Sequence, residues 1–492
     1  MASHQLARGA RHLVQQAVAS SSSIAAGASA STSTGTSSAF AFASAVPHSS
    51  LRCFSASAAQ SAAKAKAVTP KKKSTVKKKT HTGPRGMGGP KRKGGLDAGP
   101  SASKTSEFHQ DAPDMSSLGV FSSESITKAV VGKPLAWNDK ALSAFKHFGL
   151  PRDLQRELAA QPRPRTLVRE QTLKVLDRLD AAAKSGQTHK LVLTGSPGCG
   201  KSTLLAQSVS YALDEGWAVV YVPQAIDLIN SSTTYSYSPS QLAYLQPEVT
   251  RSMISAMLQL NQAIFKRIAT AEAVELERSA TLEAGTTLDK VARQGIDENL
   301  NAAARQQVLD LILQTLARQT EVPVLVAVDE VQALFRTSLY RDPDYAALES
   351  YELGVPRSLL ALLEGKGSFA SQRLVFVGAL SSTQTEYPTP TELQVALQDR
   401  AGGPDAIPAL GRAAHAYVRL QQRHLANAHA AALEPVDVSD PLTTSEAAAL
   451  FAQLKGERKL WSPANDELFV AKFVESAGNP RRFSRSLTST LL

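Results

Sequence analysis

The stretch that decides the fold is LVLTGSPGCGKSTLLAQ, residues 191–207. It starts with a short apolar run typical of a strand, continues with eight residues that match G-x-x-x-x-G-K-[ST], and ends in a segment typical of a helix. Gly195, Gly198 and Gly200 allow backbone conformations that other residues avoid, and they bring successive N–H groups toward a phosphate. The following helix adds its positive end. This order of strand, loop and helix predicts a phosphate-binding loop that holds a nucleoside triphosphate.

Side chains of the same loop supply further predicted contacts. Lys201 adds a point charge that reaches the terminal phosphates, the Ser202 hydroxyl is a ligand for Mg²⁺, and Thr203 is expected to support the loop from behind. The predicted nucleotide-binding residues of the loop are Gly195, Pro197, Gly198, Cys199, Gly200, Lys201, Ser202 and Thr203.

An acidic strand is expected to complete the site. Residues 323–330, PVLVAVDE, form a continuous apolar, largely β-branched run of the kind that is buried on both faces of a sheet. Asp329 at its end is placed to hold the magnesium ion, and Glu330 is the candidate catalytic base that would polarise an attacking water. The two halves together indicate nucleotide binding more strongly than they indicate hydrolysis.

Two further positions are candidates for sensing the nucleotide. Ser381 follows a third apolar strand, residues 373–380, where AAA+-like ATPases carry a polar residue that contacts the terminal phosphate. Arg481 follows Gly478-Asn479-Pro480, a sequence that predicts one helix end and the next helix start. Ordinary loop residues and exposed arginines explain both positions equally well, and Arg336 and Arg341 are weaker candidates of the same kind.

The order of motifs predicts an α/β fold: a P-loop NTPase core of the AAA+-like type, with a parallel sheet, a helical insertion, a helical C-terminal region and a basic N-terminal extension. A helix is expected to start near Thr166, which would cap it. Helical stripes in the insertion, at Val249, Met253 and Met257 among others, are expected to be core. The expected organisation is an import signal over 1–54, a disordered basic extension over 55–105, a segment over 106–164 that packs on the core, the core over 165–400 with its insertion at 225–320, and a mainly helical region over 401–492.

The N-terminus has the composition of a mitochondrial presequence. A helix over residues 3–18 would separate apolar from basic side chains without any acid, and a Ser/Ala-rich stretch follows. Residues 1–96 hold 15 Lys and Arg and no acid, whereas the remaining 39 basic and 43 acidic residues leave the rest of the chain at −4. The lysine-rich part after residue 55 is either a salt-dependent anchor for RNA or DNA, or a solvated linker. The predicted location is the mitochondrial matrix.

Several function classes are disfavoured. Two cysteines cannot build a disulfide framework or a structural zinc site alone, and no H-E-x-x-H or serine nucleophile elbow occurs. No apolar run reaches the ~18 residues that span a bilayer.

Four runs carry a more specific resemblance. GWAVVYVP at 216–223, LVAVDEVQALF at 325–335, GALS at 378–381 and Asn479-Pro480 resemble, in order and spacing, the death-associated protein 3 family, over roughly residues 166–492. The resemblance implies a GTP-binding structural component of the mitochondrial small ribosomal subunit. It implies ribosomal RNA and other small-subunit proteins as partners, with bridge contacts to the large subunit, and neither a membrane nor a homo-oligomer.

The bound nucleotide is expected to be GTP or GDP with Mg²⁺, but guanine follows from the resemblance only. No N-K-x-D motif occurs, so ATP stays an alternative. Two other functions also stay open: a matrix AAA+-like ATPase that cycles on ATP and remodels complexes as a ring, and an NTPase bound to nucleic acid through the lysine-rich tail.

Overall fold

The computed structural model describes residues 118–489, except 187, 280, 366–368, 370–372, 404–406, 408–409, 411–417 and 461. The predicted import signal (1–54), the basic extension (55–105) and the first part of the 106–164 segment lie outside the described residues. None of the helices in the described residues has both the length and the apolar composition of a membrane span.

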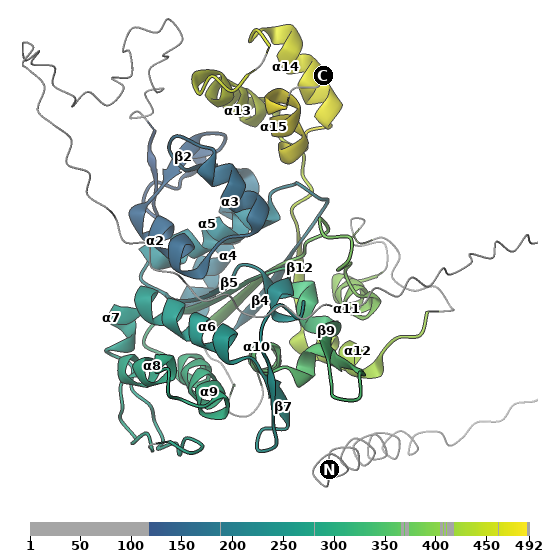
Figure 1. Cartoon of the computed structure of the whole chain (residues 1–492). Coiled ribbons are helices and arrows are strands. Elements are labelled where there is room, and N and C mark those ends of the chain that lie inside the picture. The colour runs from purple at the N-terminus through teal and green to yellow at the C-terminus, as the bar shows by residue number, and fades with distance from the viewer. Residues whose placement is uncertain are drawn as a thin grey trace, which may run out of the picture. The chain divides into compact units, whose positions relative to one another are not determined.

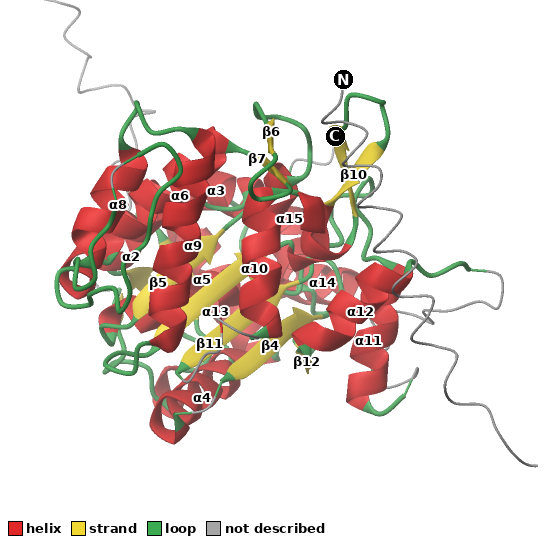
Figure 2. Ribbon diagram, turned by 90° about the horizontal axis from the view of Figure 1, so that it is seen from below, coloured by secondary structure: helices red, strands yellow, loops and turns green. Residues whose placement is uncertain are grey.

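A five-stranded, all-parallel sheet forms the centre of the molecule (Figure 2). Its strand order is β12-β4-β11-β8-β5, so the strand before the glycine loop lies between the third apolar strand and the chain's last strand. The register aligns Ala379 with both Leu193 and Asp329. The loops after β4, β8 and β11 therefore leave one edge of the sheet together. The strands are β4 (His189–Thr194), β5 (Ala218–Val222), β8 (Val324–Asp329), β11 (Leu374–Ala379) and β12 (Glu434–Asp437).

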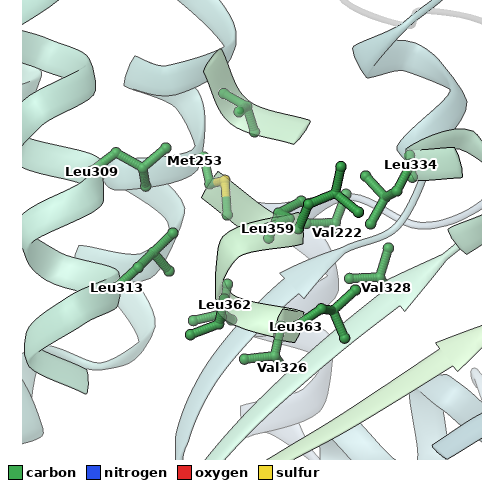
Figure 3. Packing of buried hydrophobic residues seen from close by; sticks show 14 of the residues in the cluster. Val222, Met253, Leu309, Leu313, Val326, Val328, Leu334, Leu359, Leu362 and Leu363 are labelled. Carbon is green, nitrogen blue, oxygen red and sulfur yellow. The ribbon is translucent and has the colours of Figure 1, made fainter. Parts of the chain in front are cut away.

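Alternate residues of the strands enter two separate cores. Val326 and Val328 point into one core with α6, α9 and α10, as Figure 3 shows, whereas Leu325 and Ala327 point into the other with α4 and α5. All four are buried, and full burial of a side chain such as Val or Leu contributes about 1.5–3 kcal/mol. The helices are α4 (Glu170–Ser185), α5 (Lys201–Asp214), α6 (Pro247–Leu260), α9 (Ala302–Arg318) and α10 (Gly354–Glu364).

The insertion over 225–320 is not purely helical. The predicted stripes are core, since Met253, Met257, Val308 and Ile312 are buried, but a two-stranded antiparallel hairpin precedes the helices. The other elements of this part are η2 (Ala225–Leu228), β6 (Ser236–Ser238), β7 (Ala243–Leu245), α7 (Gln262–Phe265) and α8 (Leu288–Ile296).

The predicted helix start at Thr166 is wrong by four residues. Thr166 lies in β3 (Arg165–Leu167), which pairs antiparallel with β2 (Pro134–Trp137), and α4 begins at Glu170. The Thr172 hydroxyl accepts the Arg169 N–H at 3.1 Å, so the helix is capped from inside its first turn. The remaining N-terminal elements are β1 (Val120–Phe121), η1 (Lys128–Val130), α2 (Asp139–Phe148) and α3 (Arg152–Ala159), and their apolar side chains share the core of α4 and α5.

The boundary predicted at residue 400 cuts through the sheet. β12 pairs in parallel with β4 and belongs to the core, although it comes from the region expected to be a separate helical part. Between β8 and β12 the chain adds η3 (Val331–Phe335), β9 (Thr337–Arg341), β10 (Ala347–Glu349), η4 (Ser350–Glu352), α11 (Thr391–Ala401) and α12 (Gln422–Ala431).

The last three helices form what we call the C-terminal helical unit, namely α13 (Thr444–Gly456), α14 (Asp466–Ser476) and α15 (Pro480–Thr488) (Figure 1). The unit has its own small apolar core around Phe483. Buried Arg165 of β3 pairs with Glu457 at the end of α13, which links this unit to the segment before the glycine loop.

Candidate nucleotide-binding site

The glycine loop joins β4 to α5 at the carboxyl edge of the sheet, as predicted. Gly195, Gly198 and Gly200 have φ of +140°, +83° and +107°, which side chains rarely adopt. A Cβ at Gly198 would lie 2.8 Å from the Arg481 Cβ and 2.9 Å from the Asn479 Oδ1. The second glycine is therefore required both by backbone conformation and by the close approach of the C-terminal helical unit.

Lys201 is held inside the loop. Its buried side chain donates to the carbonyl oxygens of Gly195 at 2.8 Å and Ser196 at 2.9 Å. Its third contact is the Cys199 sulfur at 3.8 Å, a weak acceptor that a phosphate oxygen would replace. The ammonium group is thus fixed in position, with one donor available for a ligand.

The backbone amides at the start of α5 are also available. The first bond of the helical ladder is donated by Leu204 to the Gly200 carbonyl at 2.9 Å. The N–H groups of Lys201, Ser202 and Thr203 precede that ladder, as at every helix start. Such amides, together with the helix dipole, form a natural anion site.

Three donors from elsewhere in the chain hold the carbonyls of the loop. Arg169 donates to the Cys199 oxygen at 3.1 Å, the Asn479 amide donates to the Pro197 oxygen at 3.0 Å, and the Arg481 N–H donates to the Gly198 oxygen at 3.3 Å. We call these three contacts the loop brace. A loop whose carbonyls are engaged in this way is preorganised, so ligand binding does not have to order it.

Arg169 extends the brace into the C-terminal region. Its guanidinium also donates to the carbonyls of Asp440 at 2.8 Å and Pro441 at 3.2 Å, and it lies 3.5 Å from a carboxylate oxygen of Glu446. Sequence reasoning missed Arg169 and Asn479 as parts of the site. Asn479 carried the signal of a helix cap, whereas nothing local distinguishes Arg169.

Asp329 lies beside the loop with the properties of a metal ligand. It is 1% exposed, its Oδ1 accepts the Glu330 N–H at 2.8 Å, and its buried Oδ2 has no hydrogen-bond partner among the described residues. Burial raises its pKa to about 6, while the neighbouring Ser202 hydroxyl lowers it. A buried carboxylate oxygen without a partner next to a hydroxyl fits Mg²⁺, which prefers oxygen ligands.

Glu330 is engaged in hydrogen bonds that a free catalytic base would not make. It has a left-handed backbone, φ +59°, and one carboxylate oxygen accepts the Ile226 N–H at 3.2 Å. The other oxygen accepts the Gln384 amide at 2.9 Å. Burial, followed by the charge of Asp329, raises its pKa to about 7.

Only one of the two sensor candidates reaches the loop. Arg481 contacts the loop through its backbone, while its guanidinium lies 2.5 Å from Asp153 of α3. Ser381 forms two backbone hydrogen bonds with the Gln332 side chain instead. Its N–H donates to the Gln332 Oε1 at 3.1 Å, and its carbonyl accepts the Gln332 amide at 2.8 Å.

Arg336 and Arg341 donate their side-chain hydrogen bonds to carbonyls outside the glycine loop. Arg336 donates to the carbonyls of Glu386 and Pro388, and Arg341 donates to the Tyr345 carbonyl at the turn between β9 and β10. Among the described residues there is also no group of three or more His, Cys, Asp or Glu that could hold a metal ion.

Comparison with known proteins gives a consistent result. The family model of mitochondrial ribosomal death-associated protein 3 matches residues 166–486. Three similar curated proteins are called small ribosomal subunit protein mS29. The one from Schizosaccharomyces pombe is 24% identical over 384 residues, which are 74% of this chain and 75% of the relative. The one from Neurospora crassa is 23% identical over 211 residues, which are 41% of this chain and 43% of the relative. The mouse protein is 23% identical over 251 residues, which are 50% of this chain and 63% of the relative.

The chain thus spans less than half of the Neurospora relative and three quarters of the fission-yeast one. The family match covers more than half of the chain, and it contains the glycine loop, the acidic strand and most of the C-terminal helical unit. The chain therefore belongs to the mitochondrial ribosomal death-associated protein 3 family, whose matching members are small-subunit proteins of the mitochondrial ribosome.

Proposed function

We propose that this chain is a nucleotide-binding structural component of the small subunit of the mitochondrial ribosome and supports mitochondrial translation. The observation that carries the nucleotide part is the preorganised loop, in which Lys201 is fixed by two carbonyls and the outer carbonyls are held by the loop brace. The core is a P-loop NTPase of the AAA+-like type in this proposal. Its loops after β4, β8 and β11 share one edge, where such proteins bind nucleotides.

Each site residue has a defined role. The loop amides and Lys201 bind the phosphates, while Ser202 and Asp329 hold Mg²⁺, which neutralises phosphate charge. In this proposal Thr203 supports the loop, and Ser381 and Arg481 would sense the terminal phosphate once Arg481 leaves Asp153 and Ser381 leaves Gln332.

A retained nucleotide fits the site better than rapid turnover. Glu330, the candidate base, accepts two hydrogen bonds from protein groups, the Ile226 N–H and the Gln384 amide. The matrix ATPase hypothesis needs this carboxylate free to activate water. A ligand that binds only the folded state adds about 2.7 kcal/mol at 100 times its Kd, so a bound nucleotide stabilises the protein without hydrolysis.

The bound species is GTP or GDP in this proposal, on the strength of family resemblance. The same reasoning gives mitochondrial ribosomal RNA and other small-subunit proteins as partners, with bridge contacts to the large subunit and no homo-oligomer. Residues 1–54 act as the matrix import signal and 55–105 as a basic extension.

The test is sedimentation of mitochondrial lysate through a sucrose gradient, followed by chromatography of the nucleotide released from the fractions that contain this chain. Migration with the small subunit, carrying guanine nucleotide, is the expected result. A Lys201→Ala variant should migrate with the subunit but carry no nucleotide. A free or ring-sized species that carries adenine nucleotide would contradict the proposal.

A further inference from the structure

A basic pocket of about 350 Å³ borders the glycine loop at Pro197. One wall is α15 with its arginines, another is Asp153 of α3, and a third is Thr383 in the segment after β11. The lining residues are Asp153, Pro197, Thr383, Asn479, Arg481, Arg482 and Arg485. The pocket thus has three guanidinium groups and a single carboxylate.

The charges in this pocket are only partly compensated. Arg481 pairs with Asp153, whereas the side chains of Arg482 and Arg485 form no hydrogen bond or ion pair with any described residue. The next carboxylate is that of Glu157, an exposed residue of α3 that interacts electrostatically with Arg481 and Arg485, and its single charge offsets only part of the charge of the three guanidinium groups. The pocket therefore has an excess of positive charge beside a loop that is itself built for anions.

Packing fixes the face of α15 that carries these arginines. Phe483 and Leu487 on the opposite face of α15 are 0% and 4% exposed in the core of the C-terminal helical unit. Arg482 and Arg485 are three residues apart, and so lie side by side on the helix. The Thr383 hydroxyl adds a neutral donor from another wall. Two neighbouring guanidinium groups and a hydroxyl match the oxygens of a phosphate group.

We propose that this pocket is a second phosphate site, separate from the loop that Gly195–Ser202 forms, in which Arg482 and Arg485 bind a phosphate group. Two sources have this chemistry. One is the terminal phosphate of the nucleotide, which rests on the proposed function, and the other is a backbone phosphate of RNA, which does not.

The experiment compares the full chain with an Arg482→Ala/Arg485→Ala double variant. The charge-matched control is Arg251→Ala/Arg293→Ala, which removes two exposed arginines from α6 and α8, outside the pocket lining. For each protein, calorimetry gives the affinity for GTP and for GDP, and fluorescence anisotropy gives the affinity for a short single-stranded RNA at several salt concentrations. The basic extension is present in every protein, so the ratio of variant to control isolates the pocket.

A nucleotide source predicts that the pocket variant loses about tenfold in GTP affinity, with unchanged GDP affinity, because only the triphosphate reaches the pocket. An RNA source predicts an about tenfold loss of RNA affinity and a shallower salt dependence, with both nucleotides unaffected. The proposal is overturned if the pocket variant and the control bind GTP, GDP and RNA alike.

Two cases need a further measurement: an unstable alanine variant, and an unaltered chain that binds no nucleotide. If the alanine variant has a clearly lower melting temperature than the control, the variant Arg482→Lys/Arg485→Lys replaces it. Lysine keeps the positive charge but lacks the planar guanidinium, so this variant is expected to recover only part of the affinity for the phosphate. If the unaltered chain binds neither GTP nor GDP, the proposed nucleotide function fails, and the RNA measurement alone decides on the pocket.

Discussion

Replacing Asp329 by asparagine is expected to stabilise the nucleotide-free protein at neutral pH, although it removes a residue of the site. Burial raises the pKa of this carboxyl from 3.8 to about 6. Each pKa unit corresponds to about 1.4 kcal/mol, so keeping the ionised group buried costs about 3 kcal/mol above pH 6. Asparagine keeps an acceptor for the Glu330 N–H and offers its amide to the Ser202 hydroxyl without the charge.

The sign of the pH dependence follows from the direction of the shift. A carboxyl whose pKa is higher in the folded state holds its proton more tightly there, so the folded state is favoured at low pH. The contribution of Asp329 to stability is therefore lost as the pH rises from about 4 to about 6, and it does not return at higher pH. The asparagine variant has no such loss.

Urea unfolding of both proteins from pH 4 to pH 8, without nucleotide, measures this difference. The free energies of unfolding should agree near pH 4, and the variant should become more stable by about 3 kcal/mol above pH 6. With Mg²⁺ and GTP present, only the unaltered chain should gain stability. A difference that is independent of pH, or a variant less stable at pH 7.5, would refute the assignment of Asp329 as a buried metal ligand that is costly to ionise in the nucleotide-free protein.

Three further experiments test the glycine loop and the pair that links the C-terminal helical unit to β3. Lys201→Ala should abolish the rise in melting temperature that saturating GTP gives, and an equal rise in both proteins would remove Lys201 from the site. Gly198→Ala should destabilise the protein more than Gly200→Ala in urea unfolding, because both glycines have positive φ but only the first Cβ meets other atoms, 2.8 Å away; equal losses would mean that contact with Arg481 does not matter. Glu457→Gln removes the buried carboxylate that pairs with both Arg165 and Lys459, so it should cost about 3–5 kcal/mol and make the C-terminal helical unit more susceptible to limited proteolysis, whereas unchanged digestion would show that the pair does not hold the unit.

The parts of the fold that the sequence predicted are those with strong local patterns. The apolar strand before the loop, the acidic strand and the strand before Ser381 all occur where continuous apolar runs placed them. Asn479 and Pro480 begin α15 as expected, since their capping geometry is set by neighbouring residues. Local signals were sufficient in these cases.

The parts that were missed depend on contacts between distant segments. β12 has the sequence EPVD, with two acids and a proline, so it has none of the apolar pattern of a buried strand; it pairs only with β4, at the edge of the sheet. Thr166 has the residue type of a helix cap but is held in β3 by pairing with Leu135. The bond from Arg169 to the Asp440 carbonyl joins residues 271 positions apart, which no local window can detect.

The separation of the braced residues also fixes the order in which the site can form. Pro197 and Asn479, which one hydrogen bond joins, lie 282 residues apart. Contacts of such high sequence separation form late, because a long loop must close first. A chain made from its N-terminus has synthesised its glycine loop long before the last helix that steadies it. The loop brace is thus complete only after the last helix has been made, so an incomplete polypeptide has the glycine loop without the contacts that preorganise it.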